Sequence, residues 1–163
     1  MNLALIGSVA LPVVVGSVSG FVYSVHREET KSWYNALRKP SFNPPSWLFP
    51  PVWTGLYMSM GYAAYLVGKE GGWERQAVPL ALYGTQLALN VAWSPLFFGA
   101  KKLGAALVDI GLLDVAVAAT AYSFYGVNET AGLLMVPYLA WISFATLLNY
   151  QIWDMNTIKA KPE

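Results

Sequence analysis

Long stretches without a charged side chain are the feature that most constrains this chain. A helix needs about 20 apolar residues to cross the roughly 30 Å hydrocarbon core of a membrane. A backbone in lipid must also satisfy its own hydrogen bonds, which an α-helix does. The sequence therefore predicts an all-α membrane protein, a five-transmembrane-helix bundle. Four stretches have no charged residue: Asn2–Val25, Pro40–Gly68, Gln76–Ala100 and Thr130–Trp153. A fifth, Leu103–Asn128, contains only Asp109 and Asp114.

The composition agrees with a lipid environment. Charged residues make up 12% of the chain, about half of what a water-soluble domain carries. The first apolar stretch lacks a basic leader and is too long for the core of a cleaved signal, so we interpret it as a helix of the protein itself. We expect one domain over 1–163, a long loop at 26–45, and helices at about 3–25, 46–68, 77–98, 103–126 and 131–153.

Charge in the connecting segments predicts the orientation of the bundle. With five spans, the 26–45 loop, the 101–102 connection and the C-terminal tail lie on one side. That side holds eight Lys and Arg residues, and the opposite side holds only Lys69 and Arg75. Positive loops face the cytoplasm, so we expect the C-terminus there and the N-terminus on the other side.

Several kinds of chemistry lack their usual residues. The chain has no Cys and one His, His26, which rules out a disulfide framework and a Cys-ligated metal site. We interpret His26 as an interfacial polar residue; a proton carrier or metal ligand is the alternative. The net charge of +1 does not suggest a nucleic-acid partner. We expect no cofactor and no conventional hydrolase site.

Two carboxylates lie within the fourth apolar stretch. Asp109 and Asp114 are five residues apart, which is about 140° around a helix, so they do not form a paired acid–base site. A charged group within a membrane costs about 2.5–3.5 kcal/mol and normally has a partner. We expect Asp109 to hydrogen-bond a neighbouring helix. For Asp114, a structural partner and a ligand or dimer contact stay equally open.

Proline and aromatic residues gather before the second predicted helix. Prolines restrict their own backbone and that of the preceding residue, so Pro40, Pro44 and Pro45 predict a rigid extended segment, with Pro50 and Pro51 in the first helical turn. Such rigidity would hold aromatic side chains over the mouth of the bundle, whereas an interfacial aromatic belt is the simpler explanation.

Polar and tryptophan side chains recur in the later helices. Asn90 and Asn149 are expected to tie helices together by hydrogen bonds. Trp53, Trp93 and Trp141 could instead line an apolar cavity for a flat ligand.

These motifs, taken in order along the chain, resemble those of the translocator protein family, also known as the tryptophan-rich sensory protein or peripheral-type benzodiazepine receptor family. The resemblance extends from the first helix to Trp153. It is carried by Trp33-Tyr34, Lys39-Pro40, Pro44-Pro45, Trp53, the run from Gln86 to Gly99, Pro137-Tyr138 with Trp141, and Leu148-Asn149-Tyr150.

The resemblance implies a five-helix bundle, often dimeric, with a ligand cavity opening towards the first loop. It implies porphyrins such as protoporphyrin IX, cholesterol and benzodiazepine-site drugs as ligands. In animals it implies the outer mitochondrial membrane with a cytosolic C-terminus; a bacterial membrane is the alternative. Carried over by position, the ligand-binding residues would be Phe49, Val52, Trp53, Asn90, Trp93, Asp109, Leu112, Trp141, Ala145 and Leu148.

Three functions follow from the resemblance. The first is a membrane receptor or carrier for porphyrins and other flat apolar ligands. The second is a light-dependent porphyrin-degrading enzyme that would use Trp53 and Trp141. The third is a cholesterol-binding adaptor of a membrane complex, although its sterol motif is incomplete: Leu148 and Tyr150 are present, but Asp154 stands where the basic residue would be.

Two further features concern shape and assembly. Ala105 occupies a position that is often Trp in mammalian members, which would change the shape of the cavity. Small residues four apart favour close helix pairing, so a homodimer could form through Gly16 and Gly20 or through Gly84 and Ala88.

Overall fold

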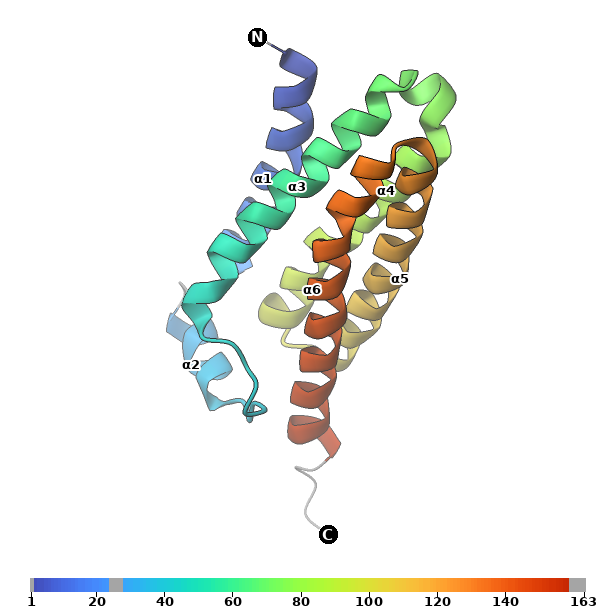
Figure 1. Cartoon of the computed structure of the whole chain (residues 1–163). Coiled ribbons are helices and arrows are strands. Elements are labelled where there is room, and N and C mark those ends of the chain that lie inside the picture. The colour runs from blue at the N-terminus through green and yellow to red at the C-terminus, as the bar shows by residue number, and fades with distance from the viewer. Residues whose placement is uncertain (1, 24–27, 159–163) are drawn as a thin grey trace.

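The computed structural model describes residues 2–23 and 28–158, and in this part of the chain every regular element is helical (Figure 1). There are three short helical turns: a 3₁₀ turn before α3, η1 (Ser46–Leu48), a π-helical turn after α4, η2 (Pro95–Gly99), and a π-helical turn after α6, η3 (Asp154–Ile158). The α-helices are α1 (Leu3–Tyr23), α2 (Glu28–Ala36), α3 (Phe49–Lys69), α4 (Gly72–Ser94), α5 (Leu103–Val127) and α6 (Glu129–Trp153).

The all-α prediction is confirmed, but the number of helices differs from it. The described residues contain six α-helices, because α2 forms inside the segment that we predicted as a loop. Residues 28–36 contain neither proline nor glycine, and Glu28 and Glu29 lie in the first turn, where carboxylates favour a helix. The chain then leaves the helix before Pro40. His26 lies outside the described residues.

Three of the long helical segments are apolar enough to cross a membrane. They are Leu3–Tyr23, Leu103–Val127 and Glu129–Thr157. Helices α3 and α4 have 21 and 23 residues, so they match these in length. Their composition is less apolar, because α3 has two prolines in its first turn and three Tyr, while α4 has Glu74 and Arg75 near its start.

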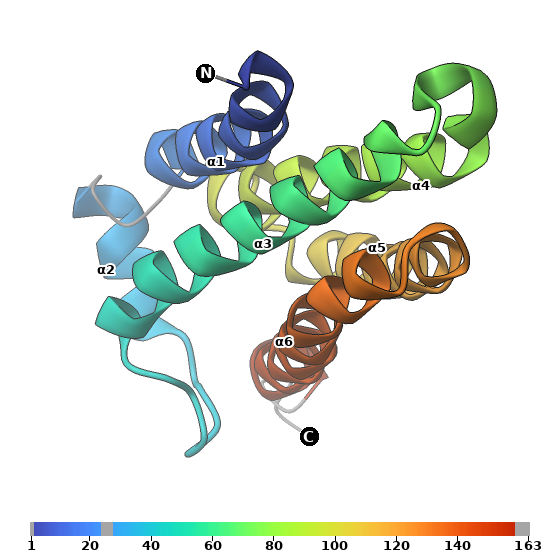
Figure 2. The same cartoon turned by 45° about the horizontal axis from the view of Figure 1, so that its top comes forward.

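The long helices run alternately up and down (Figure 1). The N-terminus, the α3–α4 turn and the α5–α6 turn lie at one end; α2, η2 and the end of α6 lie at the other. Helix α3 crosses α1 on one side and α6 on the other, and α5 packs along both α4 and α6 (Figure 2). Lysines of the α2 segment and of the α4–α5 connection thus share one end, where Lys101 pairs with Glu29 at 2.8 Å.

The connections are as short as the sequence predicts. One residue, Asn128, separates α5 from α6, and its side-chain oxygen accepts a hydrogen bond from the Ala131 N–H at 3.0 Å. This bond caps the helix and satisfies one of its unpaired donors. Between α3 and α4 the backbone takes positive φ values at Gly71 and Gly72, which glycine adopts without steric cost.

Polar side chains tie the helices together. The prediction for Asn149 is confirmed: its Nδ2 donates to the Leu103 carbonyl at 3.2 Å, and its Oδ1 accepts from the Trp93 Nε1–H at 3.0 Å. Asp114 accepts a hydrogen bond from the Ser143 hydroxyl of α6 at 2.9 Å, which is the structural partner that we had left open. Asp109 is buried, but its Oδ2 has no hydrogen-bond partner among the described residues.

Two glycines allow α1 and α3 to approach each other closely. A Cβ on Gly16 would overlap the Tyr57 ring, and one on Gly61 would lie 2.5 Å from the Ser8 carbonyl oxygen. Of the two α1 glycines that could form a dimer contact, Gly16 and Gly20, Gly16 is therefore already in contact with α3. Gly84 and Ala88 are exposed on α4.

We predict that Gly61→Ala lowers the stability of the protein by about 1–3 kcal/mol, because the added methyl meets the backbone of α1, which cannot rotate away. Gly55→Ala is the matched control on the same helix: a Cβ there meets nothing within 4 Å. Thermal unfolding in detergent micelles measures both variants. Equal midpoints for the two would show that α1 and α3 do not pack as closely as described.

Candidate functional site

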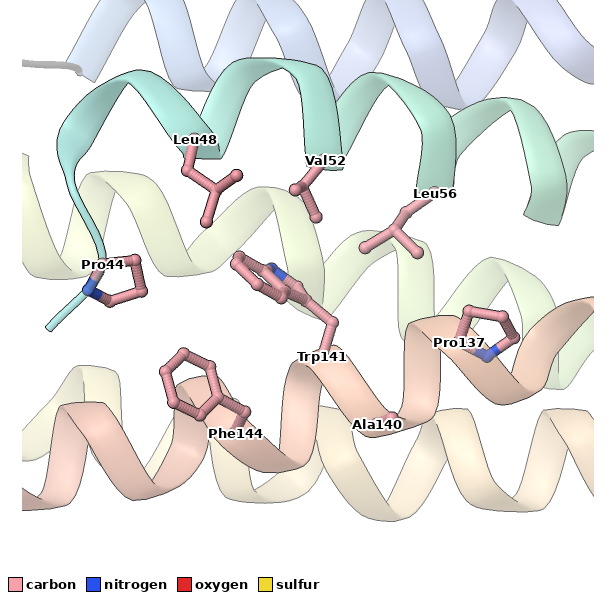
Figure 3. Close-up of a pocket in the computed structure, with 8 residues that line it drawn as sticks. All are labelled: Pro44, Leu48, Val52, Leu56, Pro137, Ala140, Trp141 and Phe144. Carbon is pink, nitrogen blue, oxygen red and sulfur yellow. The ribbon is translucent and has the colours of Figure 1, made fainter. Parts of the chain in front are cut away.

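An apolar groove of about 520 Å³ lies between α3 and α6 (Figure 3). Its volume falls in the range of small-molecule sites. Among the described residues, no side chain of α1, α4 or α5 lines it, so the groove belongs to the flank that α3 and α6 form together. The lining residues are Pro44, Leu48, Val52, Leu56, Pro137, Ala140, Trp141 and Phe144.

Helical periodicity places these side chains opposite one another. Leu48, Val52 and Leu56 are four residues apart, so they form one stripe that runs from η1 along α3 and points at α6 (Figure 3). On α6, positions 137, 140, 141 and 144 form a facing stripe by the same rule. Pro44, from the proline-rich segment before η1, closes one end of the groove.

Trp141 is the largest side chain in the wall. In the close-up its indole projects from α6 towards α3 (Figure 3). Its ring lies 5.9 Å from the Phe49 ring and 5.7 Å from the Phe144 ring, measured between centroids. The indole Nε1–H has no hydrogen-bond partner among the described residues. The wall therefore offers ring contact and no charged side chain, while the indole nitrogen itself is buried.

A hydrogen-bonded layer lies directly behind the groove. The Tyr57 hydroxyl donates to Asn90 Oδ1 at 2.8 Å, and Asn90 Nδ2 donates to the Tyr138 hydroxyl at 2.9 Å. Tyr138 in turn donates to Gln86 Oε1 at 3.0 Å. Tyr57 follows Leu56 and Tyr138 follows Pro137, so this network of α3, α4 and α6 fixes both stripes of the groove. The prediction that Asn90 ties helices is confirmed.

Some predicted site residues meet at the groove. Val52 and Trp141 line it, and Phe49 contacts Trp141. Trp53 lies one layer behind, where its ring is 5.4 Å from Tyr57 and 6.2 Å from Tyr138. The prolines before α3 and in its first turn are placed as the sequence predicts.

Other predicted site residues lie elsewhere. Trp93 stacks on Phe97 at 4.7 Å, and Phe97 and Leu148 belong to a second apolar cluster near η2. Leu112 is 57% exposed on the outer side of α5. Asp109 and the half-buried Ala145 do not line the groove. The structure thus divides the predicted set between the groove, the layer behind it and the α4–α5–α6 side of the bundle.

Six lining residues were absent from the predicted site: Pro44, Leu48, Leu56, Pro137, Ala140 and Phe144. The signal for them was present in the sequence. Leu48 and Leu56 are four residues from Val52 on either side. Pro137, Ala140 and Phe144 share the helix face of Trp141. Extending the helical period from the two predicted wall residues would have found five of the six. The sixth, Pro44, belongs to the proline-rich segment before η1.

Comparison with known proteins agrees with the motifs. A sequence model described as the TspO/MBR family matches residues 8–154. The translocator protein of Homo sapiens is 53% identical over 134 residues, which cover 81% of this chain and 79% of the human protein. That of Bos taurus is 47% identical over 146 residues, or 88% of this chain and 86% of the bovine protein.

A bacterial relative is similar over nearly the same length. The tryptophan-rich protein TspO of Chlorobaculum tepidum is 46% identical over 141 residues, which cover 84% of this chain and 88% of the bacterial protein. The matches therefore include both mammalian and bacterial proteins. Because the family match spans most of the residues from α1 to the end of α6, the chain belongs to the TspO/MBR family.

Proposed function

We propose that this protein is an integral membrane receptor or carrier that binds a flat apolar ligand, such as protoporphyrin IX, in the groove between α3 and α6. The observation that carries the proposal is the facing pair of apolar stripes with Trp141 between them. Such a wall binds by burial of apolar surface and by ring contact. It lacks the ionisable groups that acid–base catalysis needs.

The proposal places all five long helices across the membrane. Helices α3 and α4 lie between the three apolar spans and match them in length. The end that carries α2 and the paired Lys101 would face the cytoplasm, because positive segments do so. By analogy with the mammalian relatives, the membrane would be the outer mitochondrial membrane; the bacterial relatives make a bacterial membrane the alternative.

Two cations in the segment before the groove favour a porphyrin over a sterol, although the Lys39 Nζ lies over the Tyr34 ring at 4.5 Å and not at the groove. The segment that leads to Pro44 carries Arg38 and Lys39. A flat ring system with carboxylates at one edge would place its rings between the stripes and its charge near this segment.

The sterol motif has less support. Leu148 is buried and Tyr150 is 45% exposed, so the two side chains do not share a surface. Asp154 is four residues after Tyr150, about one helical turn, and it places a negative charge where the motif has a cation. Competition between protoporphyrin IX and cholesterol for the purified protein would test this preference. It would be reversed if cholesterol, which has no carboxylates, displaced the porphyrin.

We predict that the purified protein in detergent binds protoporphyrin IX saturably and that Trp141→Ala weakens binding about tenfold or more, because a central buried aromatic side chain carries much of the contact energy. Porphyrin absorbance during titration measures the affinity. Trp73→Ala is the control, since Trp73 is 62% exposed at the start of α4. Absence of saturable binding, or equal loss in both variants, would contradict a groove site.

The position of Trp141 also favours a second candidate function, light-dependent breakdown of the bound porphyrin. Electron transfer from a wall tryptophan to a photoexcited ring would leave an indole radical cation and a porphyrin radical anion, and dissolved dioxygen would have to serve as the oxidant that opens the ring. Trp53 lies one layer behind Trp141. This function predicts that porphyrin absorbance disappears faster under illumination with the wild-type protein than with the Trp53→Phe, Trp141→Phe double variant at matched occupancy. Equal rates of bleaching would leave binding alone.

A further inference from the structure

One side chain near the C-terminus holds the segment that closes the groove. The Arg38 backbone N–H donates to Asn156 Oδ1 at 2.9 Å, and Asn156 Nδ2 donates to the Arg38 carbonyl at 2.8 Å. The same Nδ2 donates to the Ile152 carbonyl at the end of α6, at 2.7 Å. Asn156 thus joins the segment after α2 to η3 through both backbone polar groups of one residue.

In this contact the N–H and the carbonyl of Arg38 are both hydrogen-bonded, as in a pair of β-strands, but their partner is the side-chain amide of Asn156. The third bond joins the same amide to the end of α6 and so fixes the orientation in which it meets Arg38. A second contact supports the same arrangement: the Phe42 ring lies 6.2 Å from the Phe144 ring, which is part of the groove wall. The segment from Arg38 to Pro44 is therefore attached at two points, to η3 through Asn156 and to α6 through Phe144.

The attached segment is also stiff. Pro40, Pro44 and Pro45 restrict its backbone, and an Asn43 N–H to Pro40 carbonyl bond of 3.0 Å closes a turn within it. A stiff segment moves as a unit rather than by local bending. Release at Arg38 would consequently displace Pro44, which closes the end of the groove.

We propose that Asn156 is a positioning residue that sets how fast a bound ligand leaves the α3–α6 groove. The inference rests on the proposed function, because it concerns the ligand of that groove. Asn156 does not line the groove; it acts through Arg38 and the stiff segment. It lies beyond residues 8–154, which match the family, so the control resides in the C-terminal turn that follows the matched region.

The test measures dissociation of protoporphyrin IX from the full-length protein in detergent, by stopped-flow displacement. Asn156→Ala removes both bonds to Arg38, and the dissociation rate should rise about five- to tenfold, as expected for hydrogen bonds of about 1 kcal/mol. Asn156→Asp keeps the size of the side chain but turns a charged oxygen towards two carbonyls, so it should behave similarly. Thr157→Ala is the control, because Thr157 is exposed in the same turn.

Amide hydrogen exchange at Arg38 provides a readout that does not depend on the ligand. Its N–H should exchange faster in both Asn156 variants and at the wild-type rate in Thr157→Ala. If exchange accelerates while the porphyrin dissociation rate stays unchanged, the contact exists but does not control release, and the inference is overturned alone. A wild-type protein that binds no porphyrin overturns the proposed function, and this inference with it.

Discussion

Hydrogen bonds between buried side chains of α3, α4 and α6 determine where the groove can form. Apolar helices surrounded by lipid gain little from burying apolar surface against each other, so packing and interhelical hydrogen bonds decide their arrangement. Here Tyr57, Asn90, Tyr138 and Gln86 form a continuous chain of bonds. Each bond contributes about 0.6 kcal/mol by itself, but together they specify which faces of α3 and α6 turn inward, and hence which faces remain for a ligand.

On each of the two helices, a residue of the groove wall and a residue of the hydrogen-bonded network are neighbours in the sequence. On α3, Leu56 faces the groove and Tyr57 faces the network; on α6, Pro137 and Tyr138 divide the same two roles. A helix turns by about 100° per residue, so neighbours in sequence serve different surfaces. A ligand in the groove therefore rests on side chains whose backbones are held by the bonds just behind them.

The sequence predicted the helical architecture because long charge-free runs in lipid allow few alternatives. It also predicted the short α5–α6 connection and the helix-tying roles of Asn90 and Asn149. It missed α2, because a nine-residue segment with six polar residues, placed between an apolar helix and prolines, is equally typical of a loop. Only docking near η2 selects the helix. The placement of Leu112 outside and Trp53 behind the wall could not be predicted, since both depend on how far each helix rotates about its own axis.

The location of the groove on the flank of the bundle has a consequence for affinity measurements. In both views no helix covers the space between the lower halves of α3 and α6 on the near side (Figures 1 and 2). In a bilayer, as we propose, a hydrophobic guest would approach sideways from the acyl chains. Its effective concentration would then be its mole fraction in lipid. A dissociation constant expressed per litre of buffer should accordingly scale with the amount of detergent or lipid in the sample, whereas one expressed per lipid molecule should stay constant.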